Sequence, residues 1–404
     1  MNIPFRTQGA GNQNIFFFVT VALLAPCILL AQSEIPLFVK TTGKLPQMAW
    51  SNGTDRLGSA KMGYIDTGIV LQVADTAGPL YKIQLSQNRH SFIEKSLVTP
   101  IELPKAPSLT TSESWRIKGG DGDDSLTINL GQKVAYQSWM EPAPSKIVLE
   151  LYGVQANTNW ITKLSSVREI YKVDYRQVED DVMQVHVFLK HKQPYGYRVF
   201  YRGNQLLITV EVPPTDRSLR GKKIIIDAGH GGSNTGAKGA TTGILEKDYT
   251  LLFAKALKKN LEEKGAIVLM VRDKDTTIEN KDRVIWAIGQ NPDLLISIHL
   301  NSAGRPSVRG VSTYYKHVSF SPLSTAILQK LLQIDGLEEF GQIGSFNFQP
   351  IQPTEYPSCL VEVAFLSNTD DEKMIRNPEF HKKVARQIKQ GILQWYENIS
   401  EVED

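Results

Sequence analysis

Short runs of alternating apolar and polar residues fill the first half of the chain. Gly68–Val73 and Leu80–Leu85 are rich in β-branched and aromatic residues, and turn residues separate such runs about every eight to twelve positions. This pattern predicts a small all-β barrel over residues 34–104. Proline residues such as Pro107 then indicate a linker over 105–124.

Alternation returns in the next part of the chain, without a strong helical pattern to interrupt it. Four such runs are Ser125–Leu130, Lys146–Leu151, Met183–Leu189 and Gln205–Val210. Several short alternating strands in succession predict a β-sandwich, which we place at 125–213. Pro213 and Pro214 end it, and a short linker over 214–221 follows.

Strand-like and helix-like segments alternate from residue 222 onward. Lys223–Asp227 is a nearly continuous apolar run, as in buried parallel strands, and Tyr249–Lys264 has apolar residues at helical spacing. Further strands are expected at Ile267–Val271, Leu294–Ile298 and Leu360–Val363, and further helices around Asp282–Gln290, Pro322–Gln333 and Pro378–Glu397. The sequence therefore predicts an α/β domain over 222–398, and a multidomain chain with two all-β modules before it.

The first residues are typical of an export signal. Arg6 and a polar stretch precede the apolar run Ile15–Ala31, and small residues at Ala31 and Ser33 favour cleavage after Ser33. We therefore expect residues 1–33 to be a signal peptide and the mature protein to be in the periplasm or cell envelope.

Two alternatives would leave the chain attached to a membrane. The apolar run could be retained as an anchor, but it is short for about 30 Å of hydrocarbon and Pro26 would disturb a helix. Cys27 could carry a lipid, although proline before the cysteine is a poor fit to lipoprotein processing. Both considerations favour removal of the segment.

Length and charge narrow the class of protein. The 404 residues exceed what one hydrophobic core usually holds, which favours two or three domains. The formal charge of +3 arises from 45 basic and 42 acidic residues, a balance that indicates no nucleic-acid partner.

Three potentially reactive residues are better explained by structure than by chemistry. After signal cleavage Cys359 would be the only cysteine, and its neighbours Pro357–Val361 read as a buried strand, so a core residue is preferred to a catalytic thiol. His186 and His191 lie in the expected sandwich, where strand and loop positions explain them without a metal.

Chemistry-bearing residues gather where the predicted strands end. His230 follows the first strand in a glycine-rich turn, His299 ends another strand, and Glu362 lies within Leu360–Val363. Ligands bind beyond the carboxyl ends of strands in open α/β sheets, so these side chains are expected to lie together. Glu246 follows a glycine-rich loop and opens a helix, from which it could reach the same place.

The residue types point to a zinc hydrolase. Two imidazoles and one carboxylate leave a fourth zinc position open for water, and a second carboxylate can accept a proton from that water. Alone, each histidine could be a structural hydrogen-bonder, and Glu246 could be a charge favoured at a helix start. Glu362 is harder to dismiss, because a carboxylate in an apolar run is costly to bury without a partner.

This segment resembles the zinc-dependent N-acetylmuramoyl-L-alanine amidases, whose domain opens with a strand and a DAGHGG-type loop. The resemblance spans about 175 residues and implies that His230, Glu246 and His299 bind Zn²⁺ and that Glu362 is the catalytic glutamate. Supporting matches are Gly236–Gly239, Lys247, Arg272, Arg283, Ser297–Asn301, Gly310-Val311 and Phe365–Asn368.

Departures from the family pattern fall outside these four residues. Asn234 and Ala364 stand where the family commonly has aspartate and glycine, which bears on loop geometry and substrate fit. Some relatives block the zinc site with a helical insertion before the catalytic glutamate. Only one helix is expected between Tyr315 and Glu362 here, so we do not expect this form of autoinhibition.

The implied activity is hydrolysis of the amide between N-acetylmuramic acid and L-alanine in peptidoglycan, by zinc-activated water with Glu362 as general base. The first module resembles SH3-like domains and the second AMIN-type domains, which implies targeting to the envelope or division site and a possible activator protein there. The rivals are an inactive peptidoglycan-binding scaffold, which should lack a ligand, and a zinc hydrolase of another amide.

Overall fold

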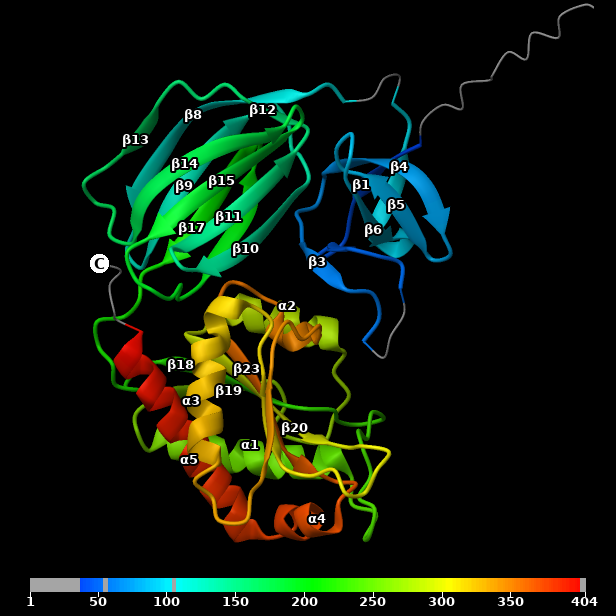
Figure 1. The fold of residues 1–404 in the computed structure, drawn as a ribbon, viewed down its shortest axis with the longest axis vertical. Coiled ribbons are helices and arrows are strands. Elements are labelled where there is room, and N and C mark those ends of the chain that lie inside the picture. Colours follow the sequence, from blue (N-terminus) through cyan, green and yellow to red (C-terminus); the bar gives the residue numbers. More distant parts are fainter. Residues whose placement is uncertain (1–36, 54–56, 104–106, 400–404) are drawn as a thin grey trace, which may run out of the picture. The chain divides into compact units, whose positions relative to one another are not determined.

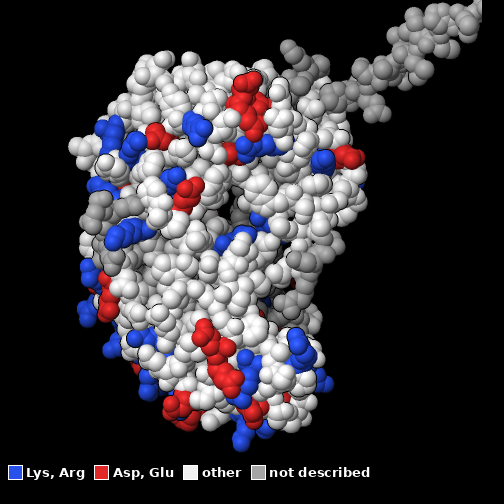
Figure 2. All heavy atoms as spheres, in the orientation of Figure 1, with Lys and Arg blue, Asp and Glu red and all other residues white. Residues whose placement is uncertain are grey.

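The computed structural model describes residues 37–53, 57–103 and 107–399 (Figure 1). The expected signal segment 1–33, including Cys27, lies outside these residues. Within the three described ranges, no helix is both long enough and apolar enough to cross a membrane. On the face in Figure 2, basic and acidic side chains are interspersed.

The first described module is a seven-stranded antiparallel sheet in the order β3-β2-β6-β5-β4-β1-β7. Alternate residues such as Met48, Ile83 and Ile93 are buried, which explains the periodicity of the sequence. An all-β first module is confirmed, and its likeness to SH3-like domains stays a prediction. The elements are β1 (Phe38–Thr41), β2 (Gln47–Ala49), β3 (Lys61–Tyr64), β4 (Val70–Ala77), β5 (Leu80–Gln84), β6 (His90–Glu94), η1 (Lys95–Leu97) and β7 (Val98–Ile101).

The second module contains two sheets, β12-β8-β9-β17-β16 with β13 beside β8, and β10-β11-β15-β14. Trp115 and Ile128 of the first sheet share one buried cluster with Leu149 and Val187 of the second, as in a β-sandwich. Its AMIN-like character stays a prediction. The strands are β8 (Thr110–Gly119), β9 (Asp123–Leu130), β10 (Tyr136–Pro142), β11 (Ser145–Tyr152), β12 (Val154–Ala156), β13 (Ile161–Lys163), β14 (Ile170–Glu179), β15 (Val182–Leu189), β16 (Tyr197–Arg202) and β17 (Gln205–Glu211).

The structure differs from the expected linker at 105–124. Strand β8 lies inside that range and pairs with β9, β12 and β13. Its buried residues include Ser112 and Trp115, and the register with β9 shifts between them. The polar residues on the buried side and this register shift hide the alternation, which is why the sequence did not predict the strand. The sandwich therefore begins at Thr110 and not at residue 125.

The third module is built on a six-stranded sheet in the order β19-β18-β20-β23-β21-β22. Strands β19, β18, β20 and β23 run parallel, and β21 runs antiparallel to β23. Its elements are β18 (Lys223–Ala228), α1 (Glu246–Glu262), β19 (Ile267–Met270), α2 (Asn280–Gln290), β20 (Leu294–Asn301), β21 (Val311–Tyr314), η2 (Val318–Phe320), α3 (Ser321–Leu331), β22 (Glu339–Ile343), η3 (Gln349–Ile351), β23 (Ser358–Phe365), α4 (Thr369–Ile375) and α5 (Pro378–Asn398).

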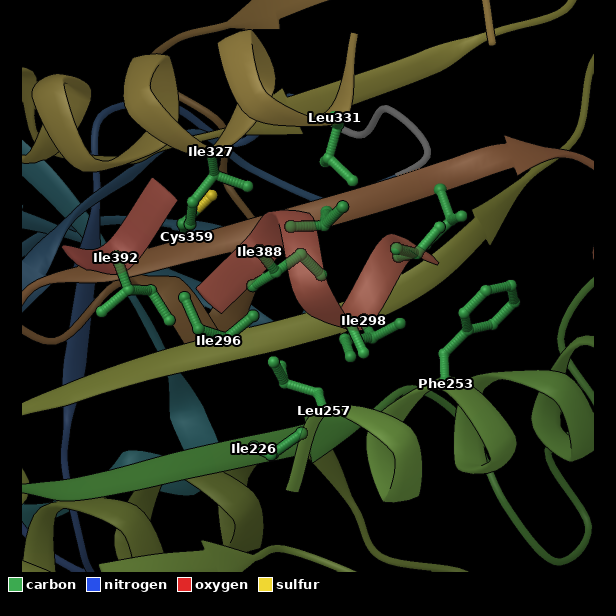
Figure 3. Close-up of a cluster of buried hydrophobic side chains, with 14 of the residues drawn as sticks. Ile226, Phe253, Leu257, Ile296, Ile298, Ile327, Leu331, Cys359, Ile388 and Ile392 are labelled. Carbon is green, nitrogen blue, oxygen red and sulfur yellow. The ribbon is translucent and has the colours of Figure 1, made fainter. Parts of the chain in front are cut away.

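Helices cover both faces of this sheet, which makes three layers. On one face, Leu257 of α1, Ile327 of α3 and Ile388 of α5 pack against Ile296 of β20 and its neighbours (Figure 3). Cys359 is fully buried in this layer, so the core interpretation of the cysteine is confirmed, and burial raises the pKa of its thiol to about 12.

The other face carries α2 and the short turn η3. Ala287 of α2 and Ile351 of η3 share a buried cluster with Ile225, Leu295 and Leu360 of the sheet. Successive residues of β20 therefore alternate between the two faces, with Ile296 on one and Leu295 on the other. An α/β carboxy-terminal module is confirmed.

Candidate metal centre

The turn after β18 places His230 in an unusual backbone conformation, with φ at 61°. Two buried arginines hold the carbonyl groups of this turn. Arg283 Nη2 donates to His230 O at 2.5 Å, and Arg272 donates from Nε to Ala228 O at 2.9 Å and from Nη2 to Gly229 O at 2.8 Å. These charge-assisted hydrogen bonds fix the direction in which the His230 side chain leaves the chain.

The arginine from α2 is itself paired. Arg283 Nη1 lies 2.5 Å from Asp227 Oδ1, and Ser297 Oγ donates to Asp227 Oδ2 at 2.8 Å. The side chains of Arg283 and Asp227 are only 4% and 1% exposed, so each compensates a charge that would be costly to bury alone. This pair ties α2 to the ends of β18 and β20.

Glu246 is the first residue of α1, where the helix dipole favours a carboxylate. Its side chain is directed into the protein: Oε2 accepts from Ala237 N at 2.8 Å and Oε1 accepts from Leu300 N at 3.0 Å. Burial alone would raise the pKa of Glu246, but hydrogen bonds from His230 and His299 hold that pKa well below its usual range. The group is therefore a carboxylate at neutral pH.

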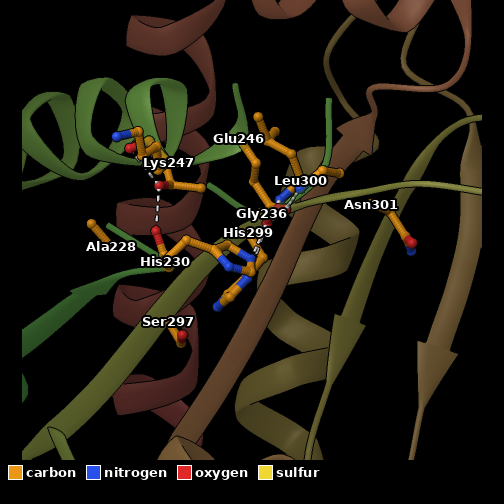
Figure 4. A network of polar contacts seen from close by, with 12 residues as sticks. Ala228, His230, Gly236, Glu246, Lys247, Ser297, His299, Leu300 and Asn301 are labelled. Atoms are coloured by element: carbon orange, nitrogen blue, oxygen red, sulfur yellow. Dashed lines mark hydrogen bonds and ion pairs between the residues drawn. The ribbon is translucent and has the colours of Figure 1, made fainter. Parts of the chain in front are cut away.

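The three expected ligands converge beyond the strand ends (Figure 4). His230 Nε2 is 3.0 Å and His299 Nδ1 is 3.1 Å from the same oxygen, Glu246 Oε1. The ring centroids of the two histidines are 4.9 Å apart, and the candidate ligand atoms of all three residues lie within 4.8 Å of one another. The structure thus brings together side chains that are far apart in the sequence.

The geometry fits a zinc ion. Ligand atoms about 2.0–2.1 Å from a tetrahedral zinc would be roughly 3.3 Å apart, close to the two spacings around Glu246 Oε1. His299 Nε2 is buried and has no hydrogen-bond partner among the described residues, so the ring retains bonding capacity. A Cβ added at Gly229 would lie 2.3 Å from the His299 ring, and one at Gly236 2.5 Å from Glu246 Oε2. Glycine at positions 229 and 236 therefore leaves the space that the side chains of His299 and Glu246 occupy.

Glu362 lies on the neighbouring strand, beside one of these residues. In the register of β20 and β23, Glu362 pairs with His299. Leu360, two residues before Glu362, lies on the face covered by α2 and η3, so Glu362 projects to that same face. Paired residues on adjacent strands project to the same face of a sheet, about 4.8 Å apart. Half-buried Glu362 is thus adjacent to the three-residue cluster.

Phe348 is a neighbour of the cluster that sequence reasoning missed. Its ring lies edge-on to His299, with centroids 5.2 Å apart, and comes from the loop before η3. A phenylalanine in a loop has no periodicity that would mark it. The FNF triplet at 346–348 was the only available signal.

The sandwich histidines have carboxylate partners of their own. His186 Nδ1 is 2.8 Å from Asp174 Oδ1 and His191 Nδ1 is 2.5 Å from Glu169 Oε2. Neither histidine joins a group of three metal-capable side chains within the described residues. Their structural interpretation agrees with these contacts.

A mainly parallel sheet flanked by helices, with two histidines and a carboxylate converging beyond its strand ends, has a layout that could hold a catalytic metal ion. Residues 224–394 match the family model described as N-acetylmuramoyl-L-alanine amidase. This match confirms the family resemblance for the carboxy-terminal segment.

The chain is also similar to cell wall amidases and to solved amidase structures. The chain is 36% identical over 193 residues to a probable cell wall amidase LytH of Staphylococcus epidermidis (strain ATCC 12228 / FDA PCI 1200), covering 45% of this chain and 63% of that relative. The chain is 35% identical over 170 residues to the Staphylococcus aureus protein of that name, covering 42% of this chain and 56% of that relative. The chain thus spans less than two thirds of these relatives. A solved N-acetylmuramoyl-L-alanine amidase from Clostridium difficile 630 is 30% identical, with 44% of this chain and 98% of that chain covered and a TM-score of 0.43.

Proposed function

We propose that the protein is a zinc-dependent N-acetylmuramoyl-L-alanine amidase, which hydrolyses the amide between N-acetylmuramic acid and L-alanine in peptidoglycan. The observation that carries the proposal is the convergence of His230, Glu246 and His299 on one point, with Glu362 paired to His299 on the next strand. The family match of residues 224–394 supports the choice of substrate.

Each residue has a role that follows from its position. His230, Glu246 and His299 would hold the zinc ion, which when bound would acidify a water molecule and polarise the substrate carbonyl. Glu362 would take the proton from that water and pass it to the leaving amine nitrogen, since a carboxylate beside the ligands can reach both atoms. Phe348 would keep water away from one side of His299.

The amino-terminal modules would determine where the enzyme acts. We propose that the chain is exported by its first 33 residues to the periplasm or cell envelope, and that the SH3-like and AMIN-like modules direct it to peptidoglycan or to an activator protein at the envelope or division site. These roles rest on the sequence patterns, and the all-β folds of both modules agree with them.

The test is product analysis of purified sacculi digested by the mature full chain, residues 34–404. Samples are the wild type, the wild type after zinc removal, and Glu362→Gln. The control is Glu339→Gln, at an exposed residue of β22 in the same sheet. We expect free stem peptides beginning with L-alanine from the wild type and the control, and a loss of about 10²–10⁴-fold in Glu362→Gln with zinc content unchanged.

The rival functions predict other results. Sacculi that bind the protein but keep glycan and peptide joined under every zinc condition would favour a binding scaffold. Release of fragments cut at another bond would favour a zinc hydrolase of a different amide. Equal activity in Glu362→Gln and the wild type would remove Glu362 from the mechanism.

A further inference from the structure

We propose that Asn234 is a positioning residue for His230, whose amide oxygen fixes the imidazole tautomer and moderates the affinity of the site for zinc. This inference rests on the proposed zinc centre. It concerns a residue that touches a ligand rather than the metal.

The contact is part of a closed turn. Asn234 Oδ1 lies 2.8 Å from His230 Nδ1 and also accepts from Gly236 N at 3.2 Å. The backbone of the same residue is bonded in both directions to Gly231, with N to O distances of 2.8 and 3.1 Å. The amide therefore has a fixed position in front of the imidazole.

The hydrogen-bond pattern determines where the His230 proton lies. The Gly236 N–H can only donate, so the side-chain atom of Asn234 that faces it is the oxygen. The same oxygen can only accept from His230, so Nδ1 carries the hydrogen. Nε2 is then the nitrogen that faces the other candidate ligands, 3.0 Å from Glu246 Oε1, and it is the nitrogen that would bind zinc.

His230 needs this restraint more than the other candidate ligands. Its side chain is 22% exposed, against 5% for Glu246 and 7% for His299. Packing holds the buried pair, whereas His230 projects from a loop. A hydrogen bond to the second ring nitrogen is the usual way to orient such a ligand.

The choice of an amide has an electrostatic consequence. With Asn234 the cluster contains a single negative charge, that of Glu246, among its ligands and the His230 partner. Aspartate at this position could accept the same two hydrogen bonds and would add a second negative charge near the cation. The neutral amide therefore orients His230 while holding zinc less tightly than a carboxylate would.

The test is the zinc dissociation constant of the mature full chain, measured by competition with a chelator. Asn234→Leu removes the acceptor and should weaken zinc binding by ~10–100-fold, whereas Asn234→Asp should tighten it severalfold. Ser233→Ala is the matched control, because Ser233 Oγ contacts Thr277 Oγ1 at 3.1 Å in the same turn. Its zinc affinity should equal that of the wild type.

A purely structural role for Asn234 would not give this order. Asn234→Leu binding zinc within about twofold of the wild type, or Asn234→Asp binding it more weakly, would overturn the inference. If the leucine variant does not fold, the zinc dissociation constant of the aspartate variant still tests the inference. The absorption spectrum of Co²⁺ bound to the aspartate variant should also shift from that of the wild type. A wild type that binds no zinc would refute the metal centre of the proposed function, whereas a wild type that binds zinc and releases stem peptides leaves that function intact whatever the variants do.

Discussion

Buried charges are the residue-scale feature that holds the site in shape. Asp227 and Arg283 have almost no exposed surface, and their 2.5 Å contact joins β18 to α2 directly below the His230 turn. Removing one member of such a pair leaves the other charge buried alone, which costs far more than the loss of an exposed pair. The residues around the site should therefore differ sharply in their tolerance to substitution.

Arg283→Ala should lower the free energy of unfolding by about 3–5 kcal/mol, because Asp227 would lose its cation. Chemical denaturation with a chelator present in every sample measures this without a contribution from metal binding. Lys258→Ala is the control: its 3.7 Å pair with Glu262 is exposed on α1 and should matter by less than about 0.5 kcal/mol. Similar losses in the two variants would show that the buried pair adds nothing.

Glu211, at the end of β17, should make stability depend on pH. Burial raises its pKa to about 7 from 4.5, and Asp123, its partner on β9, adds to the increase. The folded chain binds this proton more tightly than the unfolded chain, so stability falls as pH rises from about 4.5 to about 7 and stays lower above that range.

Glu211→Gln should remove that fall, which we expect to be on the order of 1–3 kcal/mol after allowance for solvent screening. The measurement is the free energy of unfolding at pH 5 and pH 8 for the wild type and the variant. Glu113→Gln, at an exposed position of β8, should keep the pH dependence of the wild type. An unchanged pH dependence in Glu211→Gln would contradict the assignment.

At the scale of elements, the loop between β18 and α1 decides whether the ligands can meet. It leaves the sheet at Gly229, carries His230, and returns to start α1 at Glu246. Side chains from β20 lie against this loop so closely that a methyl group would not fit at Gly229. The glycines of this loop therefore have steric roles that can be tested one at a time.

Gly229→Ala should weaken zinc binding by at least ~10-fold, since its Cβ would lie 2.3–2.6 Å from three atoms of the His299 ring. Chelator competition again gives the dissociation constant. Gly289→Ala in α2 is the matched control, because no heavy atom lies within 4 Å of the place that its methyl group would occupy. It should bind zinc normally and gain up to ~1 kcal/mol of stability, and a normal affinity in Gly229→Ala would refute the steric argument.

The sequence predicted the long, strongly periodic elements of the third module well. The expected helices begin and end within a few residues of α1, α2, α3 and α5, because each has one apolar face toward the sheet. Strands β21 and β22 and helix α4 were not expected: β21 is short, and β22 is an edge strand with little buried surface. Strand β21 pairs with β23, which is distant in sequence, and β22 joins the sheet through β21.

The site was predicted further than its surroundings. Positions at strand ends and at a helix start, together with residue types that can bind zinc, predicted that His230, Glu246 and His299 would lie together, as they do. Phe348 and the amide contact of Asn234 could not be found in this way, since both depend on how loops fold back onto the sheet. Strand β8 was hidden by its polar residues.

At the scale of the whole molecule, a metal ion at the candidate site would connect segments that are far apart in the sequence. The three candidate ligands come from the loop after β18, the start of α1 and the end of β20. A cation bound to all three would link these elements in the folded state alone. Metal content should therefore affect the stability of the chain as well as its activity.

Removal of zinc should lower the free energy of unfolding by about 2.7 kcal/mol when free zinc had been 100 times its dissociation constant. Thermal melting with and without a chelator, followed by addition of zinc, measures the shift and its reversal. His299→Ala should lose the response to zinc. His186→Ala should keep it, because His186 pairs with Asp174 in the sandwich, and a response retained in His299→Ala would argue for another binding place.

The order of strands in the third sheet has a consequence for the timing of assembly. Strand β23 lies between β20 and β21 but follows both of them in the chain, so β21 and β22 join the sheet through a strand that is synthesised after them. A nascent chain acquires all three candidate ligands by residue 299 but gains Glu362 only with β23. Under the proposed mechanism, a chain that stops early could bind metal without being able to cut. The capacity to damage a cell wall would then arise only when the protein is almost complete.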